Sequence, residues 1–171
     1  MIGYVHIYTG NGKGKTCAAI GLAIRALGAG WKVYLGQFLK SGQYSEHLAL
    51  ARFSDLLTIE TFGKPGFIQG EPSDRDRHQA QAALGQVTKA LTSGTYRLVI
   101  LDEANVAAHL GLVRVEQLIE LVDLRPQQVE LVFTGRHAHP ALIARADLVT
   151  EMQEVKHYFQ QGVAARTGVE K

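Results

Sequence analysis

A run of glycine and lysine residues near the start of the sequence carries its clearest chemical signal. Residues 9–16 read TGNGKGKT and lie between a β-forming run and an alanine- and leucine-rich run that is typical of a helix. Glycines let consecutive backbone N–H groups converge on phosphate oxygens, and the start of the next helix adds a positive dipole end. Lys15 can supply a positive charge, and the hydroxyl of Thr16 can bind Mg²⁺. The spacing therefore predicts a phosphate-binding loop, or P-loop.

This P-loop differs from the common G-x-x-x-x-G-K-[ST] pattern at one position. The pattern would place its first glycine at position 9, where the chain has Thr9. An alternative interpretation is a glycine-rich turn that only lets a helix pack closely on a strand, but the G-K-T ending at a helix start favours phosphate binding. The nucleotide-binding residues that we predict in this loop are Gly10, Asn11, Gly12, Lys13, Gly14, Lys15 and Thr16.

Two acidic residues follow an apolar run. Residues 98–101 read LVIL, which is typical of a strand buried on both faces, and Asp102 and Glu103 come directly after it. Carboxylates in that position can reach Mg²⁺ beside bound phosphates, although they can also solvate a strand end. We predict that Thr16 and Glu103 bind the metal and that Asp102 has a supporting or structural role. The predicted catalytic residues are Lys15, Thr16 and Glu103.

Four further side chains are candidates for the same site. Arg136, which follows the expected strand 129–134, can neutralise phosphate charge or form a surface ion pair. His137 and His139 have a spacing that could suit a metal, but no nearby third ligand completes a site, so we expect solvated loop histidines. Cys17 lies at a helix start, where the pKa of a thiol can fall, yet we favour an inert core residue.

The elements that must position these residues alternate between strand and helix. Strands are expected at 3–8, 32–38, 57–61, 98–101, 129–134 and 148–150. Helices are expected at 16–29, 45–53, 73–92, 115–123 and 140–146, the third with a capping box at Ser73. This alternation predicts an α/β fold, P-loop NTPase-like (RecA-like), with a mostly parallel sheet and helices on both faces. Ligands bind at the carboxyl ends of the strands in such sheets, where the candidate residues fall.

Size and composition exclude several classes of protein. The chain has 171 residues, 46% of them hydrophobic, which suffices for one core, so we expect a single domain over residues 1–171. Its 18 basic and 16 acidic residues are mixed along the sequence, without the basic stripe of a nucleic-acid binder. One cysteine excludes an internal disulfide framework, and no apolar run is long enough to span a membrane. We expect a soluble, cytoplasmic protein that binds neither nucleic acid nor membranes.

Four segments together resemble one family, the P-loop type of ATP:corrinoid adenosyltransferase. They are TGNGKGKT at 9–16, LVILDEAN at 98–105, FTGRHAHP at 133–140 and EMQEVKHYFQQGVAARTGVE at 151–170. These segments span nearly the whole chain in the expected order. The last one separates this family from other P-loop proteins, because its V-K-H, G-V-x-A-R and G-V-E motifs have no evident phosphate-binding purpose.

The resemblance implies an enzyme that uses MgATP, with Mg²⁺ or Mn²⁺, and a corrinoid. In this family Co(I) attacks the ribose 5′ carbon of ATP and expels triphosphate, so Lys13, Lys15 and Arg136 would stabilise the leaving group. The corrinoid would be cobalamin, cobinamide or cobyrinic acid a,c-diamide. The resemblance also implies a flavoprotein reductant that supplies Co(I), downstream cobalamin enzymes as further partners, and a homodimer.

Phe67 is the residue that the resemblance indicates for the corrinoid. It aligns with an aromatic residue that the family uses near the lower face of the corrin ring, although an aromatic side chain there can instead anchor the loop. The second aromatic residue expected two positions later is Gln69 in this chain, which leaves the displacement of the lower cobalt ligand open. Two other functions are alternatives. A small-molecule kinase or ATPase shares the P-loop and would release ADP and phosphate, whereas a non-catalytic corrinoid or nucleotide carrier would bind a corrinoid tightly without turnover.

Overall fold

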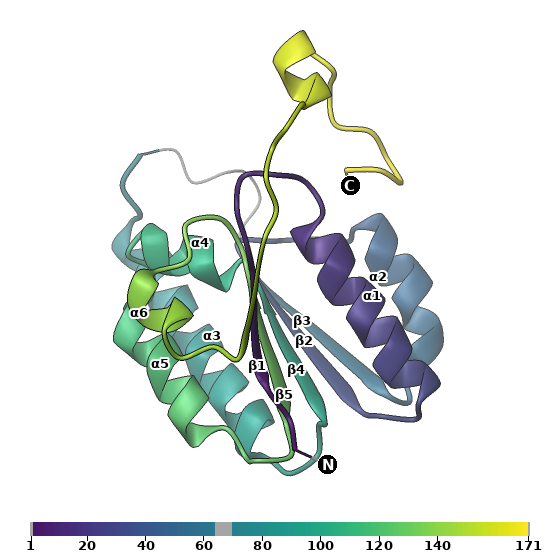
Figure 1. The fold of residues 1–171 in the computed structure, drawn as a ribbon, viewed down its shortest axis with the longest axis vertical. Coiled ribbons are helices and arrows are strands. Elements are labelled where there is room, and N and C mark those ends of the chain that lie inside the picture. The colour runs from purple at the N-terminus through teal and green to yellow at the C-terminus, as the bar shows by residue number, and fades with distance from the viewer. Residues whose placement is uncertain (1, 64–69, 171) are drawn as a thin grey trace.

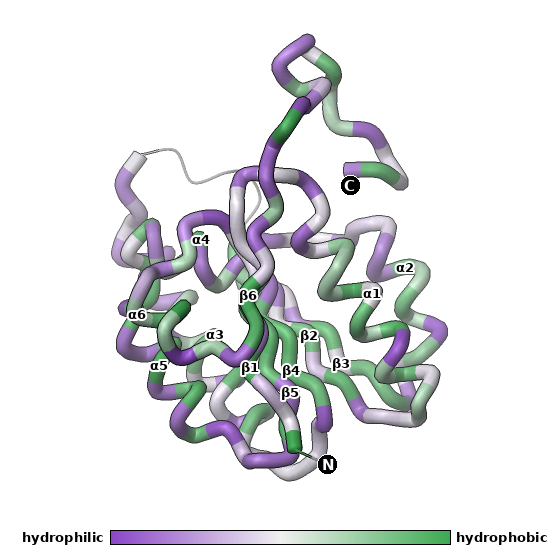
Figure 2. Tube along the Cα trace, viewed as in Figure 1, coloured by the Kyte–Doolittle hydropathy of each residue, from purple (hydrophilic) through white to green (hydrophobic). Residues whose placement is uncertain are grey.

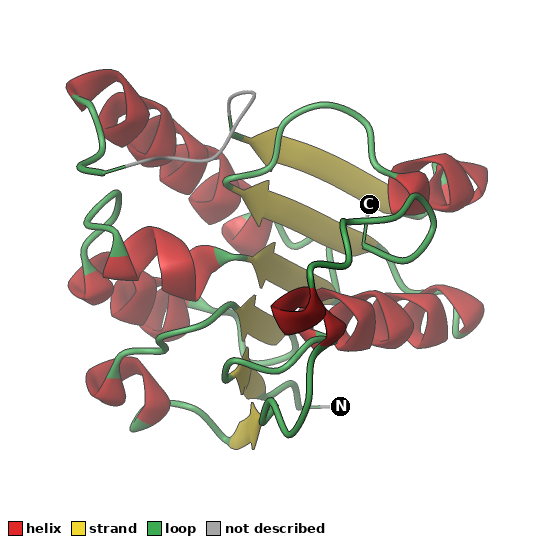
Figure 3. Cartoon of the chain, turned by 90° about the horizontal axis from the view of Figure 1, so that it is seen from above, coloured by secondary structure: helices red, strands yellow, loops and turns green. Residues whose placement is uncertain are grey.

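The computed structural model describes residues 2–63 and 70–170, and its centre is a six-stranded β-sheet (Figure 1). The strand order is β3-β2-β4-β5-β1-β6, and neighbouring strands all run parallel (Figure 3). The sequence predicted a mostly parallel sheet, and in the described residues the sheet is wholly parallel. Its strands are β1 (Val5–Thr9), β2 (Val33–Phe38), β3 (Leu57–Phe62), β4 (Leu98–Asp102), β5 (Glu130–Thr134) and β6 (Leu148–Glu151).

Helices cover both faces of the sheet, as predicted. On one face, Ala19, Ala23 and Leu27 of α1 join residues of β2, β4 and β5 in an apolar cluster. On the other face, α3 and α5 pack in a larger cluster that includes Leu84 and Leu118. None of the helices in the described ranges is long and apolar enough to cross a membrane. The helices are α1 (Lys15–Gly28), α2 (Ser45–Leu50), α3 (Asp74–Thr92), α4 (Ala104–His109), α5 (Val115–Leu124) and α6 (Pro140–Ile143), with 3₁₀ helices η1 (Ala51–Phe53) and η2 (Tyr158–Gln161).

The burial of each strand follows its place in the sheet. All five residues of β4 are buried, as a central strand covered on both faces requires. β2 is also buried along its whole length, whereas β6, at the edge, exposes all four of its residues. Hydropathy shows the same arrangement, with apolar strands at the centre and polar residues more frequent in the helices and loops around them (Figure 2). The core therefore lies on either side of β2, β4 and β5.

Two helices show how local sequence sets the bounds of an element. α3 begins after Ser73, and the predicted capping box is present: Ser73 Oγ accepts the Asp76 N–H at 3.3 Å, and Asp76 Oδ2 accepts the Ser73 N–H at 3.0 Å. The sequence does not predict α4, because six residues make less than two turns and show no clear periodicity. The helix expected at 140–146 is shorter than predicted, since α6 ends at Ile143.

The parallel arrangement brings the carboxyl ends of the strands to one edge of the sheet. The P-loop follows β1 at this edge and leads into α1. After β6 the chain continues as the C-terminal segment, residues 152–170, which rises beyond the same edge and turns back (Figure 1). The candidate residues from distant parts of the sequence therefore meet at this edge.

Candidate functional site

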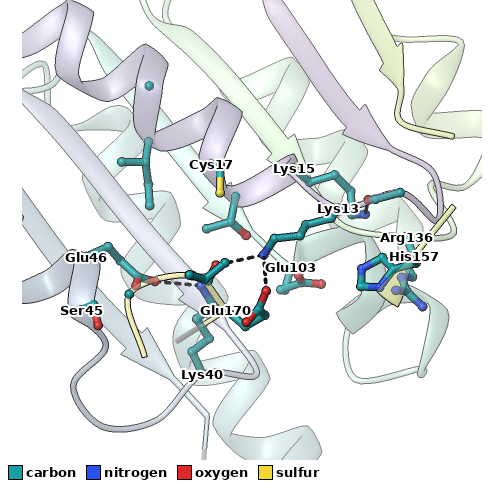
Figure 4. A pocket seen from close by; sticks show the side chains of 17 residues that line it. Lys13, Lys15, Cys17, Lys40, Ser45, Glu46, Glu103, Arg136, His157 and Glu170 are labelled. Atoms are coloured by element: carbon teal, nitrogen blue, oxygen red, sulfur yellow. Dashed lines mark hydrogen bonds and ion pairs between the residues drawn. The ribbon is translucent and has the colours of Figure 1, made fainter. Parts of the chain in front are cut away.

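A pocket of about 830 Å³ lies at the carboxyl edge of the sheet, between the P-loop and the C-terminal segment (Figure 4). Its volume falls within the range of about 300–1,000 Å³ that is usual for small-molecule sites. Most of the predicted site residues line this pocket, namely Gly12, Lys13, Gly14, Lys15, Thr16, Glu103 and Arg136. Gly10 and Asn11, which were also predicted, belong to the loop but are not among the residues that line the pocket. The structure thus brings together residues from three strand ends.

Lys15 folds back onto its own loop. Its ammonium group donates hydrogen bonds to the carbonyl oxygens of Gly10 and Gly12, each at 2.7 Å. Burial lowers the pKa of Lys15, and the nearby charge of Arg136 adds to this effect, while neighbouring carboxylates oppose it. A bound anion would favour the charged form of Lys15 and offset the repulsion from Arg136. The pocket is therefore electrostatically suited to a polyphosphate.

Thr16 and Asp102 join the P-loop to the end of β4. Thr16 Oγ1 donates a hydrogen bond of 2.9 Å to Asp102 Oδ1, and Thr134 Oγ1 donates one of 2.6 Å to the same oxygen. The Asp102 side chain is fully buried. Because its proton is directed to Asp102, the Thr16 oxygen keeps its lone pairs for another partner, such as a hard cation. The acid in direct contact with Thr16 is thus Asp102.

Lys40 and Gln37 complete the surroundings of Asp102, and neither was predicted. Lys40 Nζ lies 3.0 Å from Asp102 Oδ2 and 3.3 Å from Glu46 Oε1, and Gln37 Nε2 donates a 3.0 Å hydrogen bond to Asp102 Oδ2. Burial alone would lower the pKa of Lys40, but the carboxylates of Asp102 and Glu46 outweigh it and raise the pKa. A sequence signal for both residues did exist. Gln37 lies at the end of β2 and Lys40 lies just after it, and the carboxyl ends of parallel strands meet at the edge of the sheet where ligands bind.

A chain of hydrogen bonds connects Asp102 to α2. His47 Nε2 is hydrogen-bonded to Gln37 Oε1, and His47 Nδ1 accepts a 3.1 Å bond from the backbone N–H of Tyr44. Since Nδ1 accepts, Nε2 carries the hydrogen and the ring is neutral. Burial lowers the pKa of His47, which favours this neutral form. The segment around α2, which forms one wall of the pocket, is thereby tied to the buried carboxylate.

Glu103 lies in the pocket with an unusual backbone conformation. Its φ of 60° is in the left-handed region, which costs a non-glycine residue about 1–3 kcal/mol and is concentrated at functional sites. Its N–H donates a 3.0 Å hydrogen bond to Thr134 Oγ1. Burial raises the pKa of Glu103, and Asp102 adds to this, while the nearby cations lower it. A divalent cation would favour the ionised form, and metal binding by Glu103 stays a prediction.

Arg136 reaches the pocket from the loop after β5. That loop turns at Gly135, which has a φ of 126° and whose carbonyl accepts a 3.2 Å hydrogen bond from Asn105 Nδ2. In the described part of the chain Arg136 forms no ion pair, so the alternative of a surface ion pair has no partner there. A phosphate-neutralising role for Arg136 remains the prediction, and the pocket places it near Lys15.

The glycines of the P-loop make room for the C-terminal segment. A Cβ on Gly10 would lie 2.4 Å from the carbonyl oxygen of Met152, and one on Gly12 would lie 2.8 Å from the same oxygen. The Gly12 N–H donates to this oxygen at 2.7 Å, and the Met152 N–H donates to the Thr9 carbonyl at 2.9 Å. Thr9, which replaces the usual glycine, ends β1 and pairs with Glu151 of β6. Glycine at positions 10 and 12 is therefore required for the close approach of the C-terminal segment to this loop, and the Gly12 N–H is bonded to that segment.

The prediction for Cys17 was wrong. Its side chain is exposed and lines the pocket instead of packing in the core. The reason is the orientation of α1, which buries Lys15, Ala19 and Ala23 at intervals of four residues and turns Cys17 to another side. The pocket thus contains a thiol that the sequence did not predict there.

The loop histidines His137 and His139 are exposed, as expected, and each contacts a neighbouring group of the protein. His137 stacks on His109 with ring centroids 4.1 Å apart, and His139 Nδ1 accepts the Ala141 N–H at 3.2 Å at the start of α6. No group of three His, Cys, Asp or Glu side chains that could hold a metal ion occurs among the residues that the structure describes. Phe67, predicted for the corrinoid, and the neighbouring Gln69 lie outside the described residues.

Comparison with known proteins gives a consistent result over nearly the whole chain. The model of a family described as ATP:corrinoid adenosyltransferase BtuR/CobO/CobP matches residues 1–170. A corrinoid adenosyltransferase of Pseudomonas aeruginosa is 36% identical over 169 residues, which cover 98% of this chain and 83% of that protein. Corrinoid adenosyltransferases of Sinorhizobium sp and Escherichia coli (strain K12) are 32% and 31% identical, each over 98% of this chain and over 80% and 85% of their own lengths.

Proposed function

Because the chain belongs to the ATP:corrinoid adenosyltransferase family, we propose that the pocket beside the P-loop is where the adenosyl group of ATP passes to a corrinoid. The observation that carries this proposal is the meeting of two unlike parts of the sequence in one pocket. One wall holds Lys15 and Thr16, which suit phosphates, and the other belongs to residues 152–170, whose motifs distinguish this family. The enzyme's two substrates therefore have a common place to meet.

The charges of the pocket suit the leaving group of this reaction. The electron pair of Co(I) forms the cobalt–carbon bond, and the bond between the 5′ carbon and its phosphate oxygen breaks, so that its electron pair leaves with triphosphate. Negative charge grows on the phosphates, and Lys13, Lys15 and Arg136 are the cationic groups that would stabilise it. No proton is transferred in this step, so the neutral His47 is not needed as a base.

Thr16 and Glu103 are the residues that would hold Mg²⁺ or Mn²⁺. Both supply oxygen ligands, which hard cations prefer, and both line the pocket. The proton of Thr16 is directed to Asp102, which leaves its oxygen available, and Glu103 has a raised pKa that a cation would offset. When bound, the metal would neutralise part of the phosphate charge.

A second subunit and a reductant complete the proposal. β6 exposes Leu148 and Val149, and Ile2 and Tyr4 expose about half of their surfaces just before β1, its neighbour in the sheet. An exposed apolar patch of this kind supports a homodimer, which light scattering during size-exclusion chromatography would test. Because Co(I) is strongly reducing, we further propose that a flavoprotein supplies its electron and that cobalamin enzymes take up the product.

The experiment that tests this function is anaerobic incubation of the protein with MgATP and chemically generated cob(I)alamin or cob(I)inamide. A light-sensitive product with a cobalt–carbon bond, formed together with triphosphate, is the expected result. ADP and phosphate, formed at a rate that the corrinoid does not change, would instead indicate a kinase or ATPase. Tight corrinoid binding without turnover under strong reductant would indicate a carrier.

A further inference from the structure

The C-terminal segment is attached to the P-loop at both of its ends. At its start, Met152 exchanges backbone hydrogen bonds with Gly12 and Thr9. At its far end, Lys13 Nζ donates a 2.9 Å hydrogen bond to the Val169 carbonyl and lies 3.6 Å from Glu170 Oε1 (Figure 4). The residues between these attachments leave the sheet edge and return to it, as the ribbon shows (Figure 1). The segment is therefore an arch that closes one side of the pocket.

Glu170 is the centre of the far attachment. Its Oε2 accepts the Arg166 backbone N–H at 2.9 Å and Arg166 Nε at 3.2 Å, and its Oε1 accepts Arg166 Nη2 at 3.2 Å. The hydroxyl of Tyr158 also donates to Glu170 Oε1, and the Arg166 guanidinium lies 4.9 Å from the centre of the Tyr158 ring. Arg166 first and then Tyr158 lower the pKa of Glu170, so this carboxylate is charged at neutral pH. The Glu170 carboxylate thus contacts Tyr158 and Arg166 of the arch as well as Lys13 of the P-loop.

The charges of this cluster are compatible with a nearby triphosphate. Lys13 and Arg166 each carry one positive charge and Glu170 carries one negative charge, which leaves a net charge of +1 on the cluster. An isolated carboxylate in this position would repel phosphate, whereas a carboxylate neutralised by two cations does not. The G-V-E and A-R motifs near residue 170 thus meet in one cluster that contacts Lys13 of the P-loop.

We propose that Glu170 is a positioning residue that clasps the C-terminal segment to Lys13 and so holds the wall of the nucleotide pocket opposite the P-loop. The inference rests on the proposed function, because it takes this pocket as the ATP site. Glu170, Val169, Gly168 and His157 line the pocket from the arch. We call the contacts of Glu170 with Lys13 and Arg166 the clasp. Loss of the clasp should weaken ATP binding while the reacting groups on the P-loop remain in place.

The first test measures the arch without any ligand. Glu170→Gln removes the negative charge with little change of shape, and Arg166→Gln removes the guanidinium that bonds to Glu170. Glu154→Gln is the matched control, since Glu154 lies in the same segment and accepts a 2.6 Å hydrogen bond from Gln160 rather than contacting the P-loop. Amide hydrogen exchange over residues 153–170 should be faster in both clasp variants and unchanged in the control. Equal exchange in all four proteins would overturn the clasp.

The second test measures ATP binding and turnover in the same proteins. Loss of a charged hydrogen-bond partner should raise the Kd and the KM for ATP about three- to tenfold in Glu170→Gln, while kcat stays close to that of the wild type. Glu170→Asp should recover part of the affinity. Faster exchange with unchanged ATP affinity, or a fall in kcat at constant KM, would show that Glu170 does not position the nucleotide wall. Failure of the wild type to bind ATP would instead count against the proposed function, and the exchange result would stand on its own.

Discussion

Thr16 and Asp102 are 86 positions apart in the sequence, and their side chains share a hydrogen bond of 2.9 Å. This bond fixes the start of α1 against the end of β4, although β5 lies between β4 and β1 in the sheet. Asp102 is fully buried and also accepts from Thr134 and Gln37. The hydroxyl of Thr16 therefore has one orientation in which its proton is committed and its oxygen is free for a cation.

Thr16→Ala should abolish most of the adenosyl transfer without unfolding the protein. The variant removes both the oxygen proposed for Mg²⁺ and the bond to Asp102, and loss of one preorganised group of this kind costs about 10²–10³-fold in kcat. Thr16→Ser, which keeps the hydroxyl, is the matched control and should retain much of the rate. Steady-state assays with circular dichroism as a folding check would measure this. Near-normal turnover by Thr16→Ala would defeat the assignment of this loop to the phosphates.

Lys40→Met should destabilise the protein strongly. Lys40 is the cation within 3.0 Å of the buried Asp102 carboxylate, and removing one partner of a buried ion pair costs about 3–5 kcal/mol. Because the pKa of Lys40 is raised, its contribution is present at neutral pH and is lost only as pH rises through the raised pKa. Urea unfolding near neutral pH measures the loss.

The control for this prediction is Lys32→Met. Lys32 is exposed just before β2, and substitution of a surface residue changes stability by about 0.5 kcal/mol or less. Equal unfolding midpoints for the two variants would show that Lys40 and Asp102 do not stabilise one another. A loss confined to Lys40→Met would confirm that the buried pair, and not the loss of one surface charge, stabilises the folded protein.

Much of the fold follows from local sequence. Short runs rich in apolar residues, at 32–38, 98–101 and 129–134, predicted the strands β2, β4 and β5, and the Ser73 capping box predicted the start of α3. The order of the strands cannot be predicted in this way, because it depends on packing between segments far apart in the chain. The short helix α4 was missed for a local reason, because its six residues are too few to show a helical period.

The candidate site was predictable where one short motif carries the chemistry. Lys15 and Thr16 belong to a motif with a known physical purpose, and both line the pocket as expected. Lys40 was missed because its contact with Asp102 depends on β2 lying next to β4. The contact of Lys13 with Glu170 likewise joins the two ends of the chain and has no local signal. The contacts between residues far apart in the sequence were therefore harder to predict than the chemical roles of the residues in the motif.

Cys17 should react with a maleimide, and MgATP should protect it. The thiol is exposed in the pocket, and it is the single cysteine of the chain, so one adduct is expected. If ATP occupies this pocket, MgATP at about ten times its Kd should slow the reaction about tenfold by mass action. Mass spectrometry over time measures the rate, with Cys17→Ser as the unreactive control. A rate that MgATP leaves unchanged would place the nucleotide elsewhere.

Glu103→Gln should stabilise the metal-free protein at neutral pH. Burial raises the pKa of Glu103 in the folded state, so its favourable contribution is present below the ordinary glutamate pKa and is lost as pH rises through the raised value. Glutamine carries no charge and avoids this loss, while it keeps the shape of the side chain. The variant should therefore match the wild type in acid and become the more stable protein as pH rises to about 8. Denaturant midpoints across this range, measured with a chelator and with Glu120→Gln as an exposed control, would show the two proteins diverge as pH rises. If Glu103 holds the cation, added Mg²⁺ and ATP should then stabilise the wild type more than Glu103→Gln, and equal gains would remove Glu103 from the metal site.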